Sequence, residues 1–405
     1  MKKFNKFLSV AVASAMVMVM AGCGNTDNGS AATGTNAATE SAAASDSAAS
    51  GSVFKIGGIG PTTGGAAVYG LAVQHGAEIA VEEINAAGGI NGYQVEFKFQ
   101  DDEADAEKSV NAYNALKDWG AQIIDGSTTS GACIAVTDKT KEDNMFQITP
   151  SGSAVECVQY DNNFRVCFSN PNQGLASAQY IGENGLAEKI AVIYDSSDVY
   201  SSGIYEKFAK EAENQPFEIV AAEAFTADNK TDFSVQLQKA KDAGADMVFL
   251  PIYYQESALI LTQAAAMGYA PKWFSCDGMD GILGGVDNFD VSLTEGVMLL
   301  TPFAADATDD LTQSFVTKYK EKYGETPNQF AADSYDAIYV IKAAIEKSGV
   351  TPDMSVSDIC DGMKAAMTEI TVDGLTGNGM TWTADGEANK APKAVVIENG
   401  AYKAM

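Results

Sequence analysis

Histidine and arginine are nearly absent from this chain of 405 residues, which contains one of each, His75 and Arg165. Catalytic triads built on histidine, and metal sites built from several histidines, therefore have almost nothing to draw on. Lysine and arginine together number 26 against 54 acidic residues, which gives a formal net charge of −28. Such a charge repels nucleic acid and anionic lipid surfaces, so we expect neither as a partner.

The common motifs of enzymes are also missing. The sequence has no Walker lysine motif and no Gly-x-Ser-x-Gly elbow. Gly58–Thr63 stands where a dinucleotide fingerprint belongs, but Thr63 replaces its third glycine. The acidic run Asp101–Asp105 resembles the start of a calcium loop, yet Ala106 and Ala112 stand where that loop needs glycine and glutamate. We therefore expect no enzyme activity, no cofactor and no metal.

The first residues have the features of an export signal. Three lysines precede an uncharged stretch at residues 7–20, which is shorter than the roughly 20 residues that span a bilayer. Met20–Cys23 then resembles a bacterial lipobox, in which Cys23 becomes the lipidated first residue. Residues 1–22 are thus predicted to be a lipoprotein signal peptide. The alternative is an ordinary secreted protein with an unrelated cysteine.

A low-complexity segment follows the predicted lipidation site. Every residue from Gly24 to Ser52 is Gly, Ala, Ser, Thr, Asn, Asp or Glu, so the segment cannot form a core. Residues 23–52 are predicted to be a lipidated, disordered tether with a reach of roughly 30 Å. This arrangement is typical of Gram-positive bacteria. It predicts a protein on the extracellular face of the cell membrane that touches the membrane only through its lipid.

The rest of the chain alternates apolar strands with helical stretches. Helices are predicted at Val68–Ala86 and Ala104–Asp118. Strands are predicted at Phe54–Ile59, Tyr93–Asp101, Ala121–Asp125, Met145–Thr149, Lys189–Asp195, Glu218–Phe225, Asp246–Leu250 and Lys272–Cys276. This alternation predicts an α/β fold with parallel sheets covered by helices, whose ligands bind at the carboxyl ends of the strands.

Several turns after the predicted strands are rich in short polar residues. They are Gly60–Gly65, Gly126–Gly131, Pro150–Ser153 and Asp277–Gly278. Their hydroxyls and backbone amides could bind a carboxylate, and Asp277 could accept hydrogen bonds from an ammonium group. Helix capping is the alternative for any single hydroxyl. Three such turns and one acid along one sheet edge favour a binding site.

Six cysteines are present. Cys157 and Cys167 are ten residues apart in a chain predicted to be exported, so they could form a disulfide or remain two separate buried thiols. Cys133, Cys276 and Cys360 are interpreted as small buried residues.

A series of short motifs runs along the chain. They are Gly60–Gly64 with Tyr69–Gly70, Gly76–Glu78, Glu83–Gly92, Ile148–Ser153, Phe164–Val166, Lys318–Tyr319 with Tyr323–Gly324, and Ala332–Ala337. In this order and spacing they resemble the motifs of the leucine/isoleucine/valine-binding proteins of ABC importers and are specific to that family. The resemblance extends from Val53 to Met405.

The resemblance implies the type I periplasmic-binding fold, in which two Rossmann-like lobes are joined by three crossovers. The first lobe would comprise residues 53–170 and 302–385. The second lobe would comprise residues 171–301 and 386–405. The ligand would lie in the cleft between the lobes, which close over it by a hinge motion.

The resemblance also implies roles for single residues. Ser130 would hold a ligand carboxylate, while Ser151 would bind through its backbone and Ser153 through its hydroxyl. Asp277 matches a glutamate that pairs with the ligand ammonium. Four aromatic residues would surround the ligand, with core packing as the alternative for each: Tyr200 and Tyr253 from the second lobe, and Tyr69 and Phe330 beside the side-chain pocket.

Two departures from the family pattern concern this pocket. Thr128 and Thr129 replace more apolar residues, and the family's disulfide partners would fall at Ala104 and Thr129. The predicted function is nevertheless that of the solute-binding subunit of an ABC importer. It would be a monomer that binds an α-amino acid of the branched-chain type and delivers it to the permease subunits. The alternatives are an amide, urea or an aromatic acid as ligand, or a sensory ligand-binding role.

Overall fold

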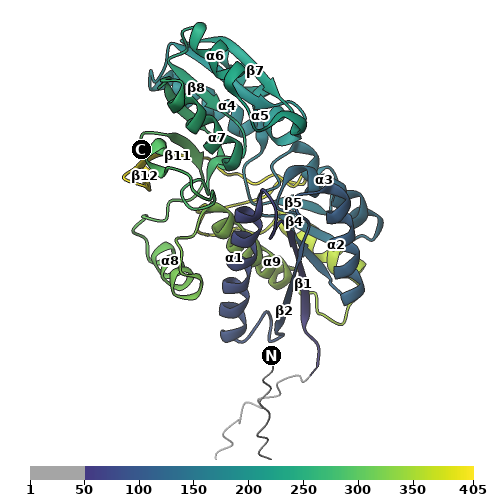
Figure 1. The fold of residues 1–405 in the computed structure, drawn as a ribbon. Coiled ribbons are helices and arrows are strands. Elements are labelled where there is room, and N and C mark those ends of the chain that lie inside the picture. The colour runs from purple at the N-terminus through teal and green to yellow at the C-terminus, as the bar shows by residue number, and fades with distance from the viewer. Residues whose placement is uncertain (1–50) are drawn as a thin grey trace, which may run out of the picture. The chain divides into compact units, whose positions relative to one another are not determined.

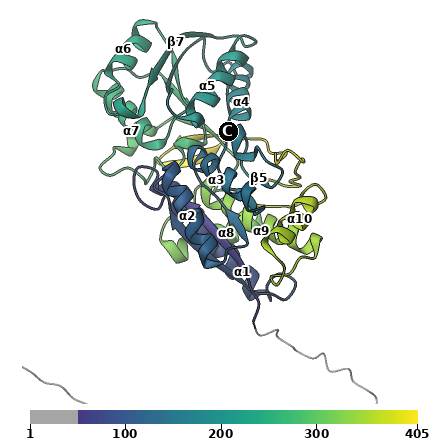
Figure 2. The same cartoon turned by 90° about the vertical axis from the view of Figure 1, so that its right-hand side faces the viewer.

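The computed structural model describes residues 51–405, which include one compact unit of alternating strands and helices (Figures 1 and 2). The predicted signal peptide, Cys23 and all but the last two residues of the predicted tether lie outside the described residues.

The first sheet has five parallel strands in the order β2-β1-β3-β4-β5. They are β1 (Phe54–Gly60), β2 (Val95–Asp101), β3 (Ile123–Asp125), β4 (Phe146–Thr149) and β5 (Asn163–Arg165). The helices that follow its strands or return to it are α1 (Ala67–Ala86), α2 (Ala106–Trp119), α3 (Ser130–Glu142), α8 (Asp310–Tyr323), α9 (Gln329–Ser348) and α10 (Val356–Met367). We call this sheet and its helices the first lobe.

The second sheet has seven strands in the order β12-β11-β10-β9-β8-β6-β7. They are β6 (Lys189–Asp195), β7 (Glu218–Phe225), β8 (Met247–Leu250), β9 (Lys272–Ser275), β10 (Met298–Thr301), β11 (Lys393–Glu398) and β12 (Ala401–Ala404). Strand β11 pairs in the antiparallel sense with both β10 and β12, and the other neighbours in this sheet pair in parallel. With α4 (Asn170–Glu183), α5 (Val199–Ala212), α6 (Ser234–Asp242) and α7 (Tyr254–Ala266), this sheet forms the second lobe.

The chain passes between the sheets three times, after β5, after β10 and before β11. This confirms the predicted fold of two α/β lobes joined by three crossovers; the residue boundaries proposed for the lobes stay a prediction. Two contacts fix the last crossover. A buried ion pair joins Lys390 to Asp333 of α9 at 2.7 Å, and Trp382 donates a 2.8 Å hydrogen bond to the carbonyl of Arg165.

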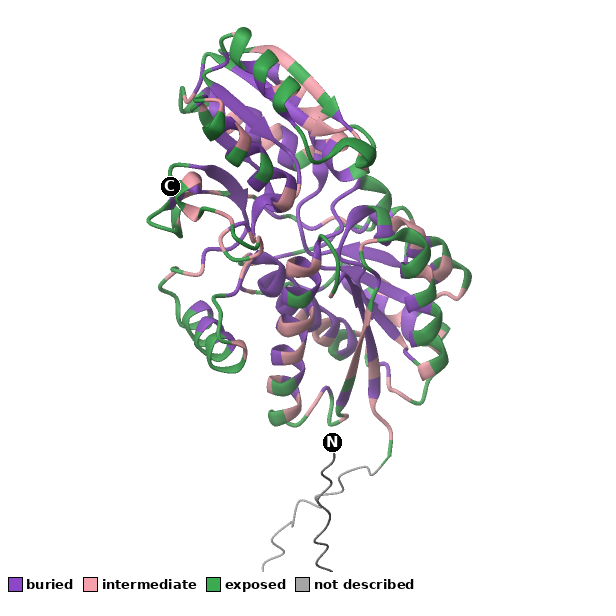
Figure 3. Cartoon of the chain, viewed as in Figure 1, coloured by how far each residue is buried: buried purple, intermediate pink, exposed green. Residues whose placement is uncertain are grey.

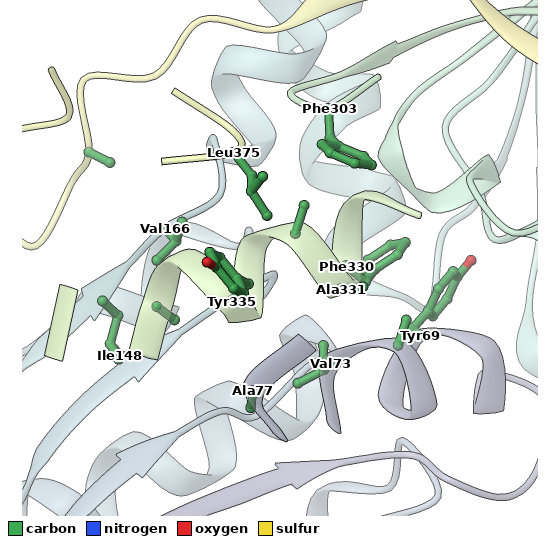
Figure 4. Packing of buried hydrophobic residues seen from close by; sticks show 14 of the residues in the cluster. Tyr69, Val73, Ala77, Ile148, Val166, Phe303, Phe330, Ala331, Tyr335 and Leu375 are labelled. Atoms are coloured by element: carbon green, nitrogen blue, oxygen red, sulfur yellow. The ribbon is translucent and has the colours of Figure 1, made fainter. Parts of the chain in front are cut away.

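The core lies under both sheets and between α1 and α9 (Figure 3). Gly76 of α1 allows the close approach of these helices, since a Cβ there would lie 2.0 Å from the carbonyl oxygen of Ala331. Figure 4 shows Val73 and Ala77 of α1 facing α9, with Tyr69 beside Phe330. The packing of the two helices therefore brings the aromatic residues of their first turns together.

Several predicted boundaries shift in the structure. Strands β5, β10, β11 and β12 were not predicted as strands. Helix α2 begins at Ala106 rather than Ala104, because the Asp105 side chain accepts a 2.9 Å hydrogen bond from the Lys108 amide and caps the helix. Ala104 itself has a φ of 58°, which lies outside the helical region.

The Cys157–Cys167 disulfide that the sequence allowed is absent, because both residues are free, buried thiols. Cys157 lies in a short 3₁₀-helix, where its thiol faces the Ser130 carbonyl oxygen at 3.7 Å. It packs with Cys133 and Ala154, and Cys167 lies outside that cluster. The structure therefore favours the alternative of separate thiols. Cys276 and Cys360 are buried as predicted.

Candidate functional site

A small cavity lies where strand ends of the two lobes face each other. Its empty volume is about 240 Å³. Residues after β3 and β4 line it from the first lobe, and residues after β8 and β9 line it from the second. The lining residues are Tyr69, Thr128, Thr129, Ser130, Ser151, Tyr200, Tyr253, Asp277, Gly278 and Phe330.

Seven of the eight residues predicted to bind the ligand line this cavity. The exception is Ser153, which is buried, with its hydroxyl 3.5 Å from that of Ser130. Ser153 therefore lies next to Ser130, outside the lining. The ligand-binding roles of all eight residues stay predictions.

Ser130 is the first residue of α3 and has a hydroxyl prepared to donate. Its Oγ accepts hydrogen bonds from the amides of Ser153 at 3.2 Å and Ala154 at 3.1 Å. With two N–H groups already directed at the oxygen, the hydroxyl proton is free to turn toward an acceptor. The N-terminus of α3 has no side-chain cap, so its first amides and the helix dipole favour an anion at the same place.

The neighbouring loop holds its shape through its own side chains. Ser151 uses its hydroxyl to donate a 2.6 Å hydrogen bond to the Thr128 carbonyl. The hydroxyl proton of Ser151 is thus already used, and its role toward a ligand through the backbone stays a prediction.

Arg165 is a positioning residue that sequence reasoning did not identify. It is fully buried and donates hydrogen bonds to the carbonyls of Gly152 at 3.2 Å and Ala154 at 2.8 Å. Its Nε also lies 3.3 Å from a carboxylate oxygen of Glu387. Arg165 thereby fixes the loop that carries Ser151. The sequence signal that could have found it is that the chain contains no other arginine.

Asp277 forms the opposite side of the cavity. Its Oδ1 accepts a 2.6 Å hydrogen bond from the Tyr200 hydroxyl, and its Oδ2 accepts a 2.8 Å hydrogen bond from the Gln173 amide. Burial raises the pKa of Asp277 to about 7, although these two hydrogen bonds act in the other direction. A cation bound in the cavity would favour the charged carboxylate and offset the energetic cost of burying it.

Two glutamines support Asp277, and nothing in the sequence pointed to either. Gln173 of α4 contacts the carboxylate, and Gln329 at the start of α9 donates a 2.9 Å hydrogen bond to the backbone carbonyl of Asp277. Gln329 belongs to the first lobe and Asp277 to the second. The contact therefore helps to hold the lobes together.

Aromatic rings from both lobes enclose the rest of the cavity. The rings of Tyr69 and Phe330 lie 4.4 Å apart between centroids, and those of Tyr200 and Tyr253 are stacked at 5.0 Å. Tyr69 also crosses to the second lobe, where its hydroxyl donates to the Gly278 carbonyl and accepts from the Tyr254 amide. The lobes are thus in contact across the site, which is the closed arrangement.

An acidic hollow of about 1,000 Å³ adjoins the cavity and shares Thr129 and Tyr253 with it. Its lining includes Asp198, and burial raises the pKa of this residue to about 6. Glu256 also lines it, in an ion pair with Lys230 at 3.1 Å. This hollow is the mouth of the cleft between the lobes.

Comparison with known proteins agrees with this geometry. Residues 53–401 match the family described as periplasmic binding protein, so the chain belongs to that family. Its members are solute-binding proteins, which confirms the expectation that the chain is not an enzyme.

Relatives of the chain are named for amino acids. It is 30% identical over 300 residues to the Leu/Ile/Val-binding protein homolog 3 of Brucella melitensis biotype 1, covering 74% of this chain and 80% of that protein. It is 30% identical over 302 residues to the leucine-, isoleucine-, valine-, threonine-, and alanine-binding protein of Pseudomonas aeruginosa, covering 73% and 78%.

A solved structure extends this likeness to three dimensions. The branched-chain amino acid transporter substrate binding protein LivJ of Streptococcus pneumoniae, in complex with isoleucine, superimposes with a TM-score of 0.78 at 29% identity. The match covers 87% of this chain and 98% of that one. The chain is therefore a solute-binding protein with the two-lobed fold of this family. Within residues 51–405, none of the helices has both the length and the apolar character needed to cross a bilayer.

Proposed function

We propose that the chain is the solute-binding subunit of an ABC importer, which encloses an α-amino acid between its lobes and delivers it to the permease. One observation carries the proposal. The same small cavity has Ser130 at a helix N-terminus on one side and the buried carboxylate of Asp277 on the other. An α-amino acid has the complementary pair of charges.

The chemistry of each side suits one end of such a ligand. The hydroxyl of Ser130 and the first amides of α3 would bind the carboxylate. Asp277 would bind the ammonium group, and the surrounding tyrosine rings would add a favourable cation–π contribution. Burying both charges is favourable only when each is fully paired, so the lobes must close around the ligand.

The names of the relatives support an amino acid as the ligand. The P. aeruginosa relative is named for ligands as small as alanine and threonine. In this proposal Tyr69 and Phe330 contact the side chain, and the contacts of Tyr69 with Gly278 and Tyr254 stabilise the closed form. The closed form is what docks on the permease.

A second candidate ligand class follows from the raised pKa of Asp277. A protonated Asp277 could donate a hydrogen bond to an amide, urea or an aromatic acid, none of which carries an ammonium group. The protein would remain a binding protein in that case, for import or for sensing. A thermal-shift screen of α-amino acids, amides and aromatic acids separates the classes. We expect stabilisation by amino acids, and stabilisation only by ligands without an ammonium group would contradict the proposal.

The location proposed for the protein rests on the N-terminal sequence. We propose a monomer, anchored on the outer face of a Gram-positive cell membrane through a lipid on Cys23. Mass spectrometry of the N-terminal peptide tests the anchor directly. A diacylglyceryl-modified Cys23 is expected, whereas a mature chain that starts elsewhere without lipid would contradict it.

A further inference from the structure

Two adjacent threonines, Thr128 and Thr129, line the cavity, but only one of their hydroxyls has a hydrogen-bond partner among the described residues. The Thr128 hydroxyl donates a 3.2 Å hydrogen bond to the Ile59 carbonyl. Thr129 is only 6% exposed, and its buried hydroxyl has no hydrogen-bond partner among residues 51–405. A buried hydroxyl without a partner is unfavourable and therefore calls for an explanation.

The position of Thr129 makes its free hydroxyl more unusual. Thr129 is the N-cap residue of α3, with extended backbone angles of −95° and 150°. A threonine at this position ordinarily accepts a hydrogen bond from an amide in the first turn, yet Thr129 makes no such bond. Thr129 lines both the cavity and the hollow that adjoins it. Its hydroxyl is thus not used for the helix.

Other hydroxyls of the cavity already have partners. Tyr200 donates to Asp277 and accepts from the Gly278 amide, while Tyr69 bonds to the second lobe. Ser151 donates to the Thr128 carbonyl. The Ser130 hydroxyl can donate to the ligand carboxylate, and the Thr129 hydroxyl can pair with a polar ligand side chain without breaking an existing contact.

Building on the proposed function, we infer that Thr129 selects α-amino acids with a side-chain hydroxyl, threonine and serine, over aliphatic ones of equal size. Threonine and valine have nearly the same shape, so the difference between them isolates this one hydrogen bond. A site built to pair a ligand hydroxyl disfavours the analogue that lacks it, because its own polar group then stays unpaired.

Isothermal titration calorimetry on the full chain tests this inference with L-threonine and L-valine. We expect threonine to bind about 10-fold more tightly than valine, the effect of one satisfied neutral hydrogen bond. In Thr129→Val the ratio should fall to about one, with threonine weakened and valine unchanged or tighter. Thr128→Val is the matched control, since its hydroxyl is already bonded to Ile59, and the ratio should persist.

Three results would overturn the inference. The first is wild-type protein that binds valine as tightly as threonine. The second is a Thr129→Val variant that loses affinity equally for both, which would place the hydroxyl on the shared carboxylate instead. In both cases the proposed function would stand. The third is the absence of binding by any α-amino acid, which would overturn the proposed function as well. The wild-type comparison is decisive even if a variant does not fold.

Discussion

The hydroxyl of Tyr200 donates a 2.6 Å hydrogen bond to Oδ1 of Asp277, linking the first turn of α5 to the segment after β9. Both residues are buried. Because Gln173 donates to the other carboxylate oxygen, Asp277 is held in one orientation before any ligand arrives. A fixed carboxylate loses little conformational freedom on binding, which favours affinity.

Replacement of Asp277 by alanine should weaken α-amino-acid binding by about 2 kcal/mol or more, since it leaves a buried ammonium group without its partner. Calorimetry measures the loss. Asp277→Asn is the matched variant, because it preserves size and one acceptor while removing the charge. We expect a similar loss from it. Unchanged affinity in both variants would refute the role of Asp277.

The pH dependence of binding should follow the pKa of Asp277. Its pKa of about 7 in the empty site means that below pH 7 a proton must leave before an ammonium group can pair with the carboxylate. Affinity for an α-amino acid should therefore fall as pH decreases from about 7, by up to roughly tenfold per pH unit. Titrations at pH 8, 7, 6 and 5 measure the slope. A ligand without an ammonium group should bind more tightly at low pH instead.

Replacement of Ser130 by alanine should weaken binding of the same ligands by about 1.5–3 kcal/mol, the range for a hydrogen bond to a charged group. The change also removes the acceptor for the amides of Ser153 and Ala154, so the thermal midpoint should fall. Ser130→Thr keeps the hydroxyl and serves as the control. Wild-type affinity in Ser130→Ala would place the carboxylate elsewhere in the cavity.

Arg165 should matter for stability more than any surface cation. Arg165→Leu leaves the carbonyls of Gly152 and Ala154 buried without donors, which should cost about 3 kcal/mol or more. Denaturant unfolding measures the difference. Lys108→Leu is a suitable control, because the Lys108 ion pair with Glu103 is exposed to solvent and should contribute little to stability. Equal effects of the two changes would contradict the positioning role.

Stability should rise as pH falls from about 8 to about 5. Burial raises the pKa of Asp125 to about 7 and those of Asp280 and Asp333 to about 6, so the folded state takes up protons in this range before the unfolded state does. Below about pH 4 the carboxyls whose pKa is lowered, such as Asp143, reverse the trend.

Asp125→Asn isolates one part of this pH effect. Asp125 contacts Ser334 through one oxygen only, at 3.0 Å. Relative to wild type, the variant should gain thermal stability as pH rises from 5 to 8, because it no longer buries a carboxylate. A difference in thermal midpoint that is the same at every pH would show that Asp125 does not titrate in this range.

The fold was predictable because its signals are local and repeated. Strands such as β1 and β3 are short apolar runs, and the turns after them, Gly60–Gly65 and Gly126–Gly131, mark the sheet edge where the cavity lies. Strands β11 and β12 escaped prediction although they form a hairpin around Asn399–Gly400, a two-residue turn whose sequence is a local hairpin signal that could have identified them.

The support around the site was less predictable, for physical reasons. Gln173 and Arg165 act through hydrogen bonds to other segments of the chain, and a local sequence pattern does not show which segments the fold brings together. Ser153 has the expected hydroxyl but lies beside Ser130 rather than at the cavity. Cys157 and Cys167 are close in sequence, yet their different packing environments keep them apart as thiols.

The central claim is that one cavity binds both charged groups of an α-amino acid and that Asp277 pairs with the ammonium group. Calorimetry of the wild-type protein at pH 7.5, comparing L-threonine with the acid that carries a hydroxyl in place of its α-ammonium group, tests it most directly. The account predicts that the amino acid binds and that the analogue binds at least about 30-fold more weakly, the equivalent of about 2 kcal/mol. Equal or tighter binding of the analogue would contradict it.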